Sequence, residues 1–171
     1  NISLACERIA GSVIEPGGIF SFNETVGLRT RENGFLDAPV IVAGEFVSGT
    51  GGGVCQASTT LMGAALRAGL RITESRPHSL SVGYVPPSQD AMVSRYSDLK
   101  FVNPYPFPVY LLGRTGNGNI SFEVYGMPDG KRYALESVVL ETIKPPPAEV
   151  VEGDEEKILR AEKSGMRSEC Y

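Results

Sequence analysis

The feature of this chain that most restricts its fold is a nearly uncharged helical segment that directly follows three consecutive glycines. Small or apolar residues recur with helical spacing at positions 57, 61, 64, 65 and 68, and Gly69 supplies a typical C-terminal stop. Arg67 is the only charged residue between positions 54 and 68. A helix without a polar face has to be covered on all sides. The sequence therefore predicts a buried central helix over residues 54–68.

The rest of the chain predicts an α+β fold, in which this central helix packs on an antiparallel β-sheet. The 20 glycines and 12 prolines among 171 residues favour turns and short strands over a helical bundle. A short amphipathic helix is expected over residues 2–10, and residues 109–114 and 120–125 flank a turn-rich segment that predicts a β-hairpin. Further short strands are expected over residues 19–22, 39–42, 71–75, 78–85 and 133–143.

The chain divides by composition into a compact part, residues 1–143, and a linker, residues 144–171. Three prolines at 145–147 make a stiff spacer, residues 149–156 are acidic, and residues 157–171 show no strong pattern. We expect this linker to lead into a following module. Because the first residue is Asn1 rather than Met, the sequence looks like a segment of a longer protein.

Charge, hydropathy and the counts of two residue types exclude several classes of function. The net charge of −4 provides no positive field for nucleic acid, so we expect no nucleic-acid partner. No apolar run approaches the roughly 18 to 20 residues that a membrane-spanning helix needs. A structural zinc site needs four ligands at short spacings, whereas the three cysteines and the one histidine lie at positions 6, 55, 170 and 78. We therefore expect no metal and no cofactor.

Cys55 is the candidate nucleophile. It lies in the first turn of the predicted helix, where unpaired backbone N–H groups and the helix dipole stabilise a thiolate. Gly52 and Gly53 permit a sharp turn, and their N–H groups, with that of Gln56, are candidates for stabilising an oxyanion in a bound substrate. The alternative is a buried structural cysteine at a glycine-rich joint.

His78, the single histidine, is the candidate general base. If residues 78–85 form a strand, its ring shares the core-facing side with Leu80 and Val82. A cysteine at a helix start and a histidine on a neighbouring antiparallel strand is the arrangement of papain-like enzymes, in the same chain order. Asp90 is the candidate third member that orients the imidazole. A core histidine bonded to a backbone carbonyl and an exposed strand cap at Asp90 remain the alternatives.

Several of these motifs together resemble the VanW family. The resemblance covers about residues 1–126 and includes Pro-Gly-Gly-Ile-Phe-Ser-Phe-Asn at 16–23, Gly-Gly-Gly-Val-Cys-Gln at 51–56, Arg-Pro-His-Ser at 76–79, Tyr-Val-Pro at 84–86 and Asp-Ala at 90–91. At positions 88 and 92 the chain has Ser and Met where we expect the family to have Gly and Thr. This departure affects how the loop before Asp90 turns.

The resemblance implies a bacterial, extracytoplasmic protein of the cell envelope, linked to glycopeptide resistance. It implies that residues 1–143 form a catalytic domain, a cysteine L,D-transpeptidase with Cys55 and His78 at the family's functional positions. Such an enzyme cross-links peptidoglycan stem peptides through a thioester and releases D-alanine. The alternatives are a hydrolytic L,D-carboxypeptidase or amidase, and a module that only binds wall peptides.

Three further side chains complete the expectations. Arg76 is a candidate ligand for a stem-peptide carboxylate, because a guanidinium grips carboxylates bidentately, and its alternative is a surface ion pair. Cys6 is expected to pack as a small apolar residue and Cys170 to lie in the tail. A disulfide between these two cysteines has no support in the sequence, and the sequence does not indicate an oligomeric state.

Overall fold

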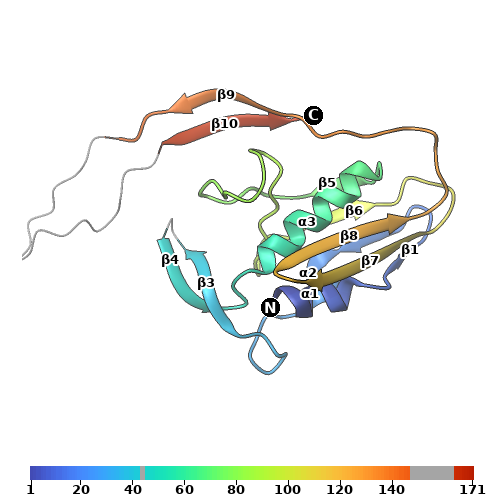
Figure 1. Ribbon diagram of the computed structural model, residues 1–171, viewed down its shortest axis with the longest axis horizontal. Helices are drawn as coiled ribbons and strands as arrows, with labels where there is room; N and C mark the ends of the chain where they lie inside the picture. Colours follow the sequence, from blue (N-terminus) through green and yellow to red (C-terminus); the bar gives the residue numbers. More distant parts are fainter. Residues whose placement is uncertain (43–44, 147–163) are drawn as a thin grey trace, which may run out of the picture.

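The computed structural model describes residues 1–42, 45–146 and 164–171, and it has an α+β fold (Figure 1). The elements follow in the order α1 (Ile2–Ile9), β1 (Val13–Ile14), β2 (Ile19–Ser21), α2 (Phe22–Val26), β3 (Asp37–Val42), β4 (Glu45–Thr50), α3 (Val54–Arg67), β5 (Arg71–Glu74), β6 (Lys100–Val102), β7 (Val109–Gly116), β8 (Asn119–Tyr125), β9 (Ser137–Ile143) and β10 (Gly165–Cys170). The predicted acidic segment, and most of the predicted linker, lie outside the described residues.

Helix α3 lies at the centre of the fold. It contacts β8 of the antiparallel sheet β1-β7-β8, and β5 of a second antiparallel sheet, β2-β6-β5. Helix α1 packs against both α3 and β7. The buried residues of α3 are Val54, Ala57, Ser58, Thr59, Leu61, Met62 and Ala65. The predicted central helix packed on antiparallel sheet is therefore confirmed.

Two other local predictions are confirmed for the same physical reasons that suggested them. Helix α1 buries Ala5, Cys6 and Ile9 on one stripe, and the chain leaves it through Gly11, whose φ is +87°. Strands β7 and β8 form the predicted hairpin, closed by Asn117 and Gly118, which both have positive φ. Two central residues with positive φ are typical of the turn that matches the twist of a two-stranded hairpin.

The strand predicted over residues 78–85 is wrong. Between β5 and β6 the chain has no regular secondary structure, and we call residues 75–99 the connecting loop. The N–H of His78 donates to the carboxylate of Asp90 at 2.7 Å, so it is not available to a strand partner. The sheet therefore does not carry His78, and the strand-borne histidine of the papain-like expectation is replaced by a loop histidine.

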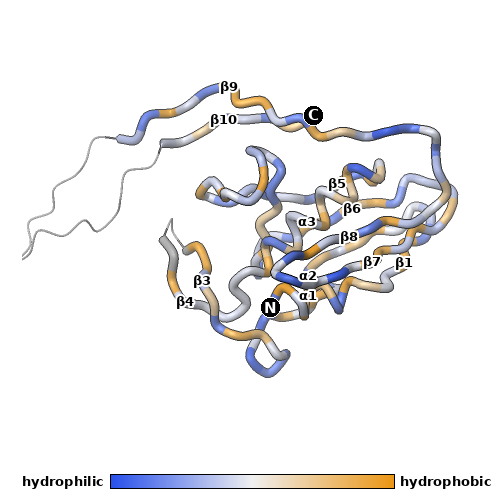
Figure 2. Tube along the Cα trace, in the orientation of Figure 1, coloured by the Kyte–Doolittle hydropathy of each residue, from blue (hydrophilic) through white to orange (hydrophobic). Residues whose placement is uncertain are grey.

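A strand that the sequence pattern does not predict, β10, pairs antiparallel with β9 to form a two-stranded ribbon at the top of Figure 1. The apolar stretch of β9 is visible in Figure 2, and Val139, Leu140 and Ile143 are each about half exposed. This pairing joins residues on both sides of position 143. The division of the chain at that residue stays a prediction.

The ribbon is tied to the connecting loop by side-chain hydrogen bonds. Ser137 Oγ donates to the carbonyl of Pro87 at 2.6 Å and accepts from the amide of Gln89 at 2.9 Å. A third bond joins the hydroxyls of Ser88 and Ser168 at 2.8 Å. These contacts fix the three residues that directly precede Asp90.

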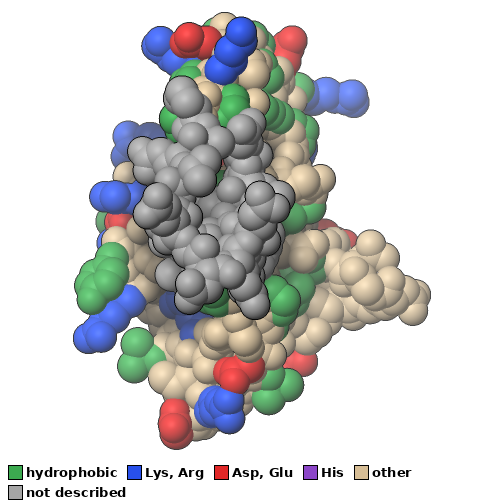
Figure 3. Space-filling model, turned by 90° about the vertical axis from the view of Figure 1, so that its left-hand side faces the viewer, with side chains coloured by type: hydrophobic (Ala, Val, Ile, Leu, Met, Phe, Trp, Pro, Cys, Tyr) green, Lys and Arg blue, Asp and Glu red, His purple; other side chains and the backbone are tan. Residues whose placement is uncertain are grey.

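The surface carries charges of both signs. On the face shown in Figure 3, blue Lys and Arg side chains are interspersed with red Asp and Glu side chains around the grey segment. Within the described parts of the chain, no helix combines the length and apolarity that crossing a bilayer requires.

Candidate active site

The start of α3 is shaped by the glycines that precede Cys55. Gly53 is the N-cap residue of the helix and has a left-handed backbone, with φ of +90°. Gly52 lies against the backbone of β3, where a Cβ atom would come within 2.6 Å of the carbonyl oxygen of Ala38. Only a residue without a side chain fits at position 52. The glycines therefore place Cys55 in the first turn of a helix whose entry is fixed by the β3–β4 hairpin.

Some backbone N–H groups around this turn have partners and others have none. The N–H of Gln56 donates to the carbonyl of Gly53 at 2.9 Å. Among the described residues, none accepts a hydrogen bond from the N–H of Gly52, Gly53 or Cys55. The first turn of a helix leaves such donors unpaired, and an anionic oxygen is their natural partner. The N–H groups of Gly52, Gly53 and Cys55 are therefore the candidate donors to an oxyanion, while that of Gln56 is already engaged.

The thiol of Cys55 lies against the connecting loop. Its Sγ atom is 3.5 Å from both the N–H and the carbonyl oxygen of Val93. Cys55 is only partly buried, unlike Cys6, which is 2% exposed and packs in the core as predicted. All three cysteines are free thiols. Cys55 is therefore a thiol that combines solvent access with hydrogen-bonding neighbours.

His78 and Asp90 form a buried pair beside this thiol. Nδ1 of His78 is 2.7 Å from Oδ2 of Asp90, and the two side chains are only 7% and 11% exposed. The backbone N–H of His78 donates to the same carboxylate. Because Asp90 occupies Nδ1, the remaining ring nitrogen, Nε2, is the one available to Cys55. The structure thus brings together the three side chains that the sequence analysis selected, and Asp90 is not the exposed cap of the alternative interpretation.

The charges of the pair follow from these contacts. Hydrogen bonds with Asp90 and with the thiol of Cys55 raise the pKa of His78 to about 9, against the opposing effect of burial. Burial favours a raised pKa at Asp90, but the hydrogen bonds from the ring and backbone of His78 outweigh it and hold the pKa below its usual value. At neutral pH the pair therefore consists of an imidazolium and a carboxylate.

The single histidine makes this charge state directly measurable. We expect the ring protons of His78 in NMR spectra to titrate with a midpoint near pH 9, well above the usual 6.5. Asp90→Asn removes the largest cause of the shift and should lower the midpoint by at least about one unit. A midpoint near 6.5 in the unaltered protein would contradict the hydrogen-bonded pair.

The same shift links His78 to stability. The pKa of His78 is higher in the folded state than in the unfolded state, so its contribution to the free energy of unfolding is fully present below pH 6.5. That contribution, about 3 kcal/mol for a shift of this size, is lost as the pH rises through 9. Urea unfolding of the wild type and Asp90→Asn should therefore differ more at pH 6 than at pH 10.

Two buried hydroxyls on α3 hold the loop segment that follows Asp90. Ser58 Oγ donates to the carbonyl of Ala91 at 2.6 Å, and the N–H of Ala91 donates to Oγ1 of Thr59 at 3.0 Å. Both side chains are almost fully buried. Neither residue was predicted to have a role, although hydroxyl residues on a nearly uncharged helix are a signal that a sequence can give. They clamp the residue next to Asp90 onto the helix that carries Cys55.

The clamp predicts an asymmetry between neighbouring hydroxyls. Ser58→Ala should lower the free energy of unfolding by about 1–3 kcal/mol, because the buried carbonyl of Ala91 loses its close partner. Thr60→Ala is the matched control, because the one hydrogen bond of that hydroxyl to a described residue is to the carbonyl of Gln56 in the same helix. It should cost about 0.5 kcal/mol or less. Urea denaturation curves give the free energy of unfolding of each variant. Equal decreases would show that the hydrogen bond from Ser58 to the loop contributes no more to stability than an ordinary bond within the helix.

Arg76, the predicted carboxylate ligand, lies at the start of the connecting loop and is exposed. Its carbonyl accepts a hydrogen bond from the N–H of Met92 at 2.7 Å. Its guanidinium adds to the larger effect of Lys100 in lowering the pKa of Glu74. The backbone of Arg76 thus closes the loop near the site, while its charge acts on a surface carboxyl.

Tyr84 is a further residue of the loop that lies near the site. Burial raises the pKa of its hydroxyl, a hydrogen bond with Thr59 works in the opposite direction, and negative charges on Cys55 and Asp90 add to the rise. The side chain is nevertheless 44% exposed. In the strand expected over residues 78–85, Tyr84 would share the core-facing side with His78, so its position at the edge of the site was not predicted.

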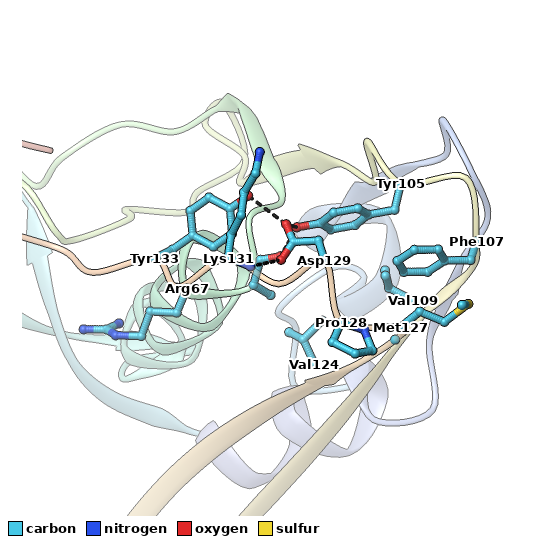
Figure 4. A pocket seen from close by; sticks show the side chains of 12 residues that line it. Arg67, Tyr105, Phe107, Val109, Val124, Met127, Pro128, Asp129, Lys131 and Tyr133 are labelled. Carbon is cyan, nitrogen blue, oxygen red and sulfur yellow. Dashed lines mark hydrogen bonds between the residues drawn. The ribbon is translucent and has the colours of Figure 1, made fainter.

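A cavity of about 220 Å³ lies at the opposite end of α3 (Figure 4). It is lined by the stacked rings of Tyr105 and Phe107, and by Tyr133, Asp129 and Arg67. The carboxylate of Asp129 already accepts hydrogen bonds from the two tyrosine hydroxyls, at 3.1 and 3.0 Å. Arg67 lies twelve residues after Cys55, or about 18 Å along the helix axis. This cavity is therefore separate from the cysteine site, and no thiol lines it.

The described residues contain no group of three or more His, Cys, Asp and Glu side chains that could hold a metal ion. The candidate site consists of a thiol, an imidazolium bonded to a carboxylate, and N–H groups at a helix start. Chemically, this set is suited to nucleophilic attack on a carbonyl carbon, with proton transfer by the imidazole.

Comparison with known proteins relates this chain to two curated sequences. Over 126 residues it is 44% identical to the Bacillus subtilis protein named "Uncharacterized protein YoaR", which covers 73% of this chain and 42% of that protein. Over 109 residues it is 30% identical to the vancomycin B-type resistance protein VanW of Enterococcus faecalis, which covers 60% of this chain and 40% of that protein. No solved structure matches significantly.

The chain thus spans about two fifths of the length of both relatives. The family described as "VanW like protein" matches residues 1–125, which include the thiol, the imidazole and the carboxylate of the site. This match covers well over half of the chain, and it agrees with the motifs on which the resemblance rests. The chain belongs to the VanW family.

Proposed function

We propose that this protein is a cysteine L,D-transpeptidase that cross-links peptidoglycan stem peptides at the bacterial cell envelope. The observation that carries the proposal is the hydrogen-bonded set of Cys55, His78 and Asp90 at the start of a helix with unpaired N–H groups. Family membership supports a role related to the cell wall, and one relative is named for vancomycin resistance. The pairing of thiol and imidazole is the one that papain-like enzymes use.

The first half of the reaction is acylation of the thiol. The Cys55 thiolate attacks the carbonyl carbon that precedes the terminal D-alanine of a donor peptide. The oxyanion that forms accepts hydrogen bonds from the N–H groups of Gly53 and Cys55. The His78 imidazolium then protonates the nitrogen of D-alanine, the C–N bond breaks, and a thioester remains on Cys55.

The second half transfers the acyl group to an acceptor. His78, now neutral, takes a proton from the amine of a second stem peptide while that amine attacks the thioester carbonyl. The C–S bond breaks, and the thiolate and imidazolium are restored. Asp90 keeps its hydrogen bond to Nδ1 throughout, which fixes the ring and stabilises its charged form.

The test is incubation of the full chain with muropeptides that carry a tetrapeptide stem, followed by mass spectrometry. We expect D-alanine and cross-linked dimers to appear in equal amounts. D-Alanine without dimers would identify a hydrolytic L,D-carboxypeptidase instead. Binding of the muropeptides with no release of D-alanine would replace the enzyme with a wall-peptide binding module.

A further inference from the structure

Arg29, on the segment between α2 and β3, has an incompletely paired guanidinium. Its Nη1 atom donates to Oδ1 of Asn23 at 2.8 Å and makes a longer contact of 3.5 Å with the carbonyl of Gly27. Its Nη2 atom is buried, and no described residue offers it a hydrogen-bond partner. Leaving a buried charged donor unpaired is unfavourable, so such an atom in a folded protein requires an explanation.

This guanidinium belongs to the surroundings of Cys55. The stem of Arg29 packs against Gly51, where a Cβ atom would come within 2.9 Å of the Cβ of Arg29. The first glycine of the triplet before Cys55 therefore leaves the space that Arg29 occupies. Burial lowers the pKa of Arg29, while negative charge on Cys55 and on Asp98 opposes that effect. Arg29 therefore lies within electrostatic range of Cys55.

The orientation of Arg29 is fixed from the far side. Asn23, which accepts the bond from Nη1, donates through its own amide to the carbonyls of Ser94 and Ser97, both at 3.0 Å. The backbone N–H of Asn23 donates to Oδ1 of the buried Asp98 at 2.9 Å. A cation held in this way is preorganised, and a ligand that pairs with its free nitrogen pays little to order it.

We propose that Arg29 binds the terminal carboxylate of the donor peptide, an inference that rests on the proposed function. The D-alanine that leaves carries its carboxylate on the residue next to the attacked carbonyl, so an anion site for this substrate has to adjoin the nucleophile. Guanidinium nitrogens pair with carboxylate oxygens in a defined plane. Arg76, the ligand expected from the sequence, is exposed and acts on Glu74. Arg29 instead has an unpaired donor, and its stem packs against Gly51, four residues before Cys55.

The test compares two alkylating reagents that differ in one group. Iodoacetate carries a carboxylate and iodoacetamide a neutral amide, and both alkylate a thiolate with loss of iodide. The measured quantity is the rate constant for alkylation of Cys55 by iodoacetate divided by that for iodoacetamide, obtained by peptide mass spectrometry. We expect this ratio to fall at least about fivefold in Arg29→Gln. Arg29→Lys keeps the positive charge but loses the planar pair of N–H donors, so it should give an intermediate ratio. Arg31→Gln, which removes only an exposed ion pair with Asp37, should leave the ratio unchanged.

Three results would overturn the proposal. Equal slowing of both reagents in Arg29→Gln would mean that Arg29 acts on the thiolate and binds no carboxylate. A fall in the iodoacetate-to-iodoacetamide ratio in Arg76→Gln but not in Arg29→Gln would assign carboxylate binding to Arg76. Unchanged rate constants for both reagents in a folded Arg29→Gln would exclude a role for this side chain.

A measurement on the wild type keeps the proposal testable if Arg29 variants fail to fold. Free D-alanine should slow alkylation of Cys55 by iodoacetate, while D-alaninamide, which lacks the carboxylate, should not. Equal effects of the two compounds would contradict carboxylate binding. Alkylation of Cys55 does not require turnover. If the protein never releases D-alanine from muropeptides, the proposed transpeptidase activity is wrong, and the alkylation data still test whether Arg29 binds a carboxylate.

Discussion

Replacing Cys55 with alanine is expected to stop D-alanine release and dimer formation together, with a loss of at least about 10³-fold in rate. The thiolate is the only group of the protein that acts as a nucleophile in the proposed reaction. The other thiols cannot replace it, since Cys6 is buried beneath Gly113 and Cys170 lies on β10. Initial rates with tetrapeptide muropeptides measure the loss.

The same variant should keep its fold. Removing one partly buried sulfur leaves a small void and lowers the free energy of unfolding by about 1 kcal/mol. Cys170→Ala is the matched control, and it should change neither turnover nor stability, because this residue lies on the outer ribbon. Full activity in Cys55→Ala would show that the nucleophile is assigned to the wrong residue.

Replacing His78 with alanine should have the next largest effect and slow acylation by about 10²- to 10⁴-fold. The variant has no group to protonate the departing amine. In the wild type, acylation should decline as the pH rises through about 9, because His78 then loses the proton it donates. That decline should be absent in His78→Ala, and rates measured from pH 6 to 10 record both results.

Alkylation separates this role from simple disruption of the site. Cys55 in His78→Ala should still react with iodoacetamide, because its thiol is only partly buried and alkylation needs no proton donor. Asp90→Asn keeps the shape of the carboxyl group and should lose less activity than His78→Ala. Acylation at the wild-type rate in His78→Ala would remove the imidazole from the mechanism.

The parts of the fold that the sequence predicts are those set by neighbours in the chain. The central helix follows from apolar spacing within fifteen residues, and the β7–β8 hairpin follows from a turn at Asn117 and Gly118. Cys55 was found for the same reason, because glycines and a helix start are both local features. His78 was selected through its scarcity and chemistry, although the strand predicted to carry it does not exist.

The remaining features depend on partners distant in sequence. Residues 78–85 alternate like a strand, yet the N–H of His78 is taken by a carboxylate twelve residues away, which no local pattern encodes. The stem of Arg29 packs in the space that Gly51 leaves, a contact between residues that are 22 positions apart. The pairing of β10 with β9 likewise spans the chain beyond the reach of periodicity.

The ribbon contacts bear on how this protein can be shortened for experiments. The family match ends at residue 125, and a fragment trimmed to that limit would lose Ser137 and Ser168, the two hydroxyls that hold residues 87–89. Ser58 and Thr59 would still clamp the loop at Ala91, so the histidine and its carboxylate would be anchored from one side. Such a fragment should retain the thiol's surroundings while its imidazole samples more orientations. A boundary drawn from sequence similarity therefore separates the reacting groups from part of the scaffold that keeps them in register.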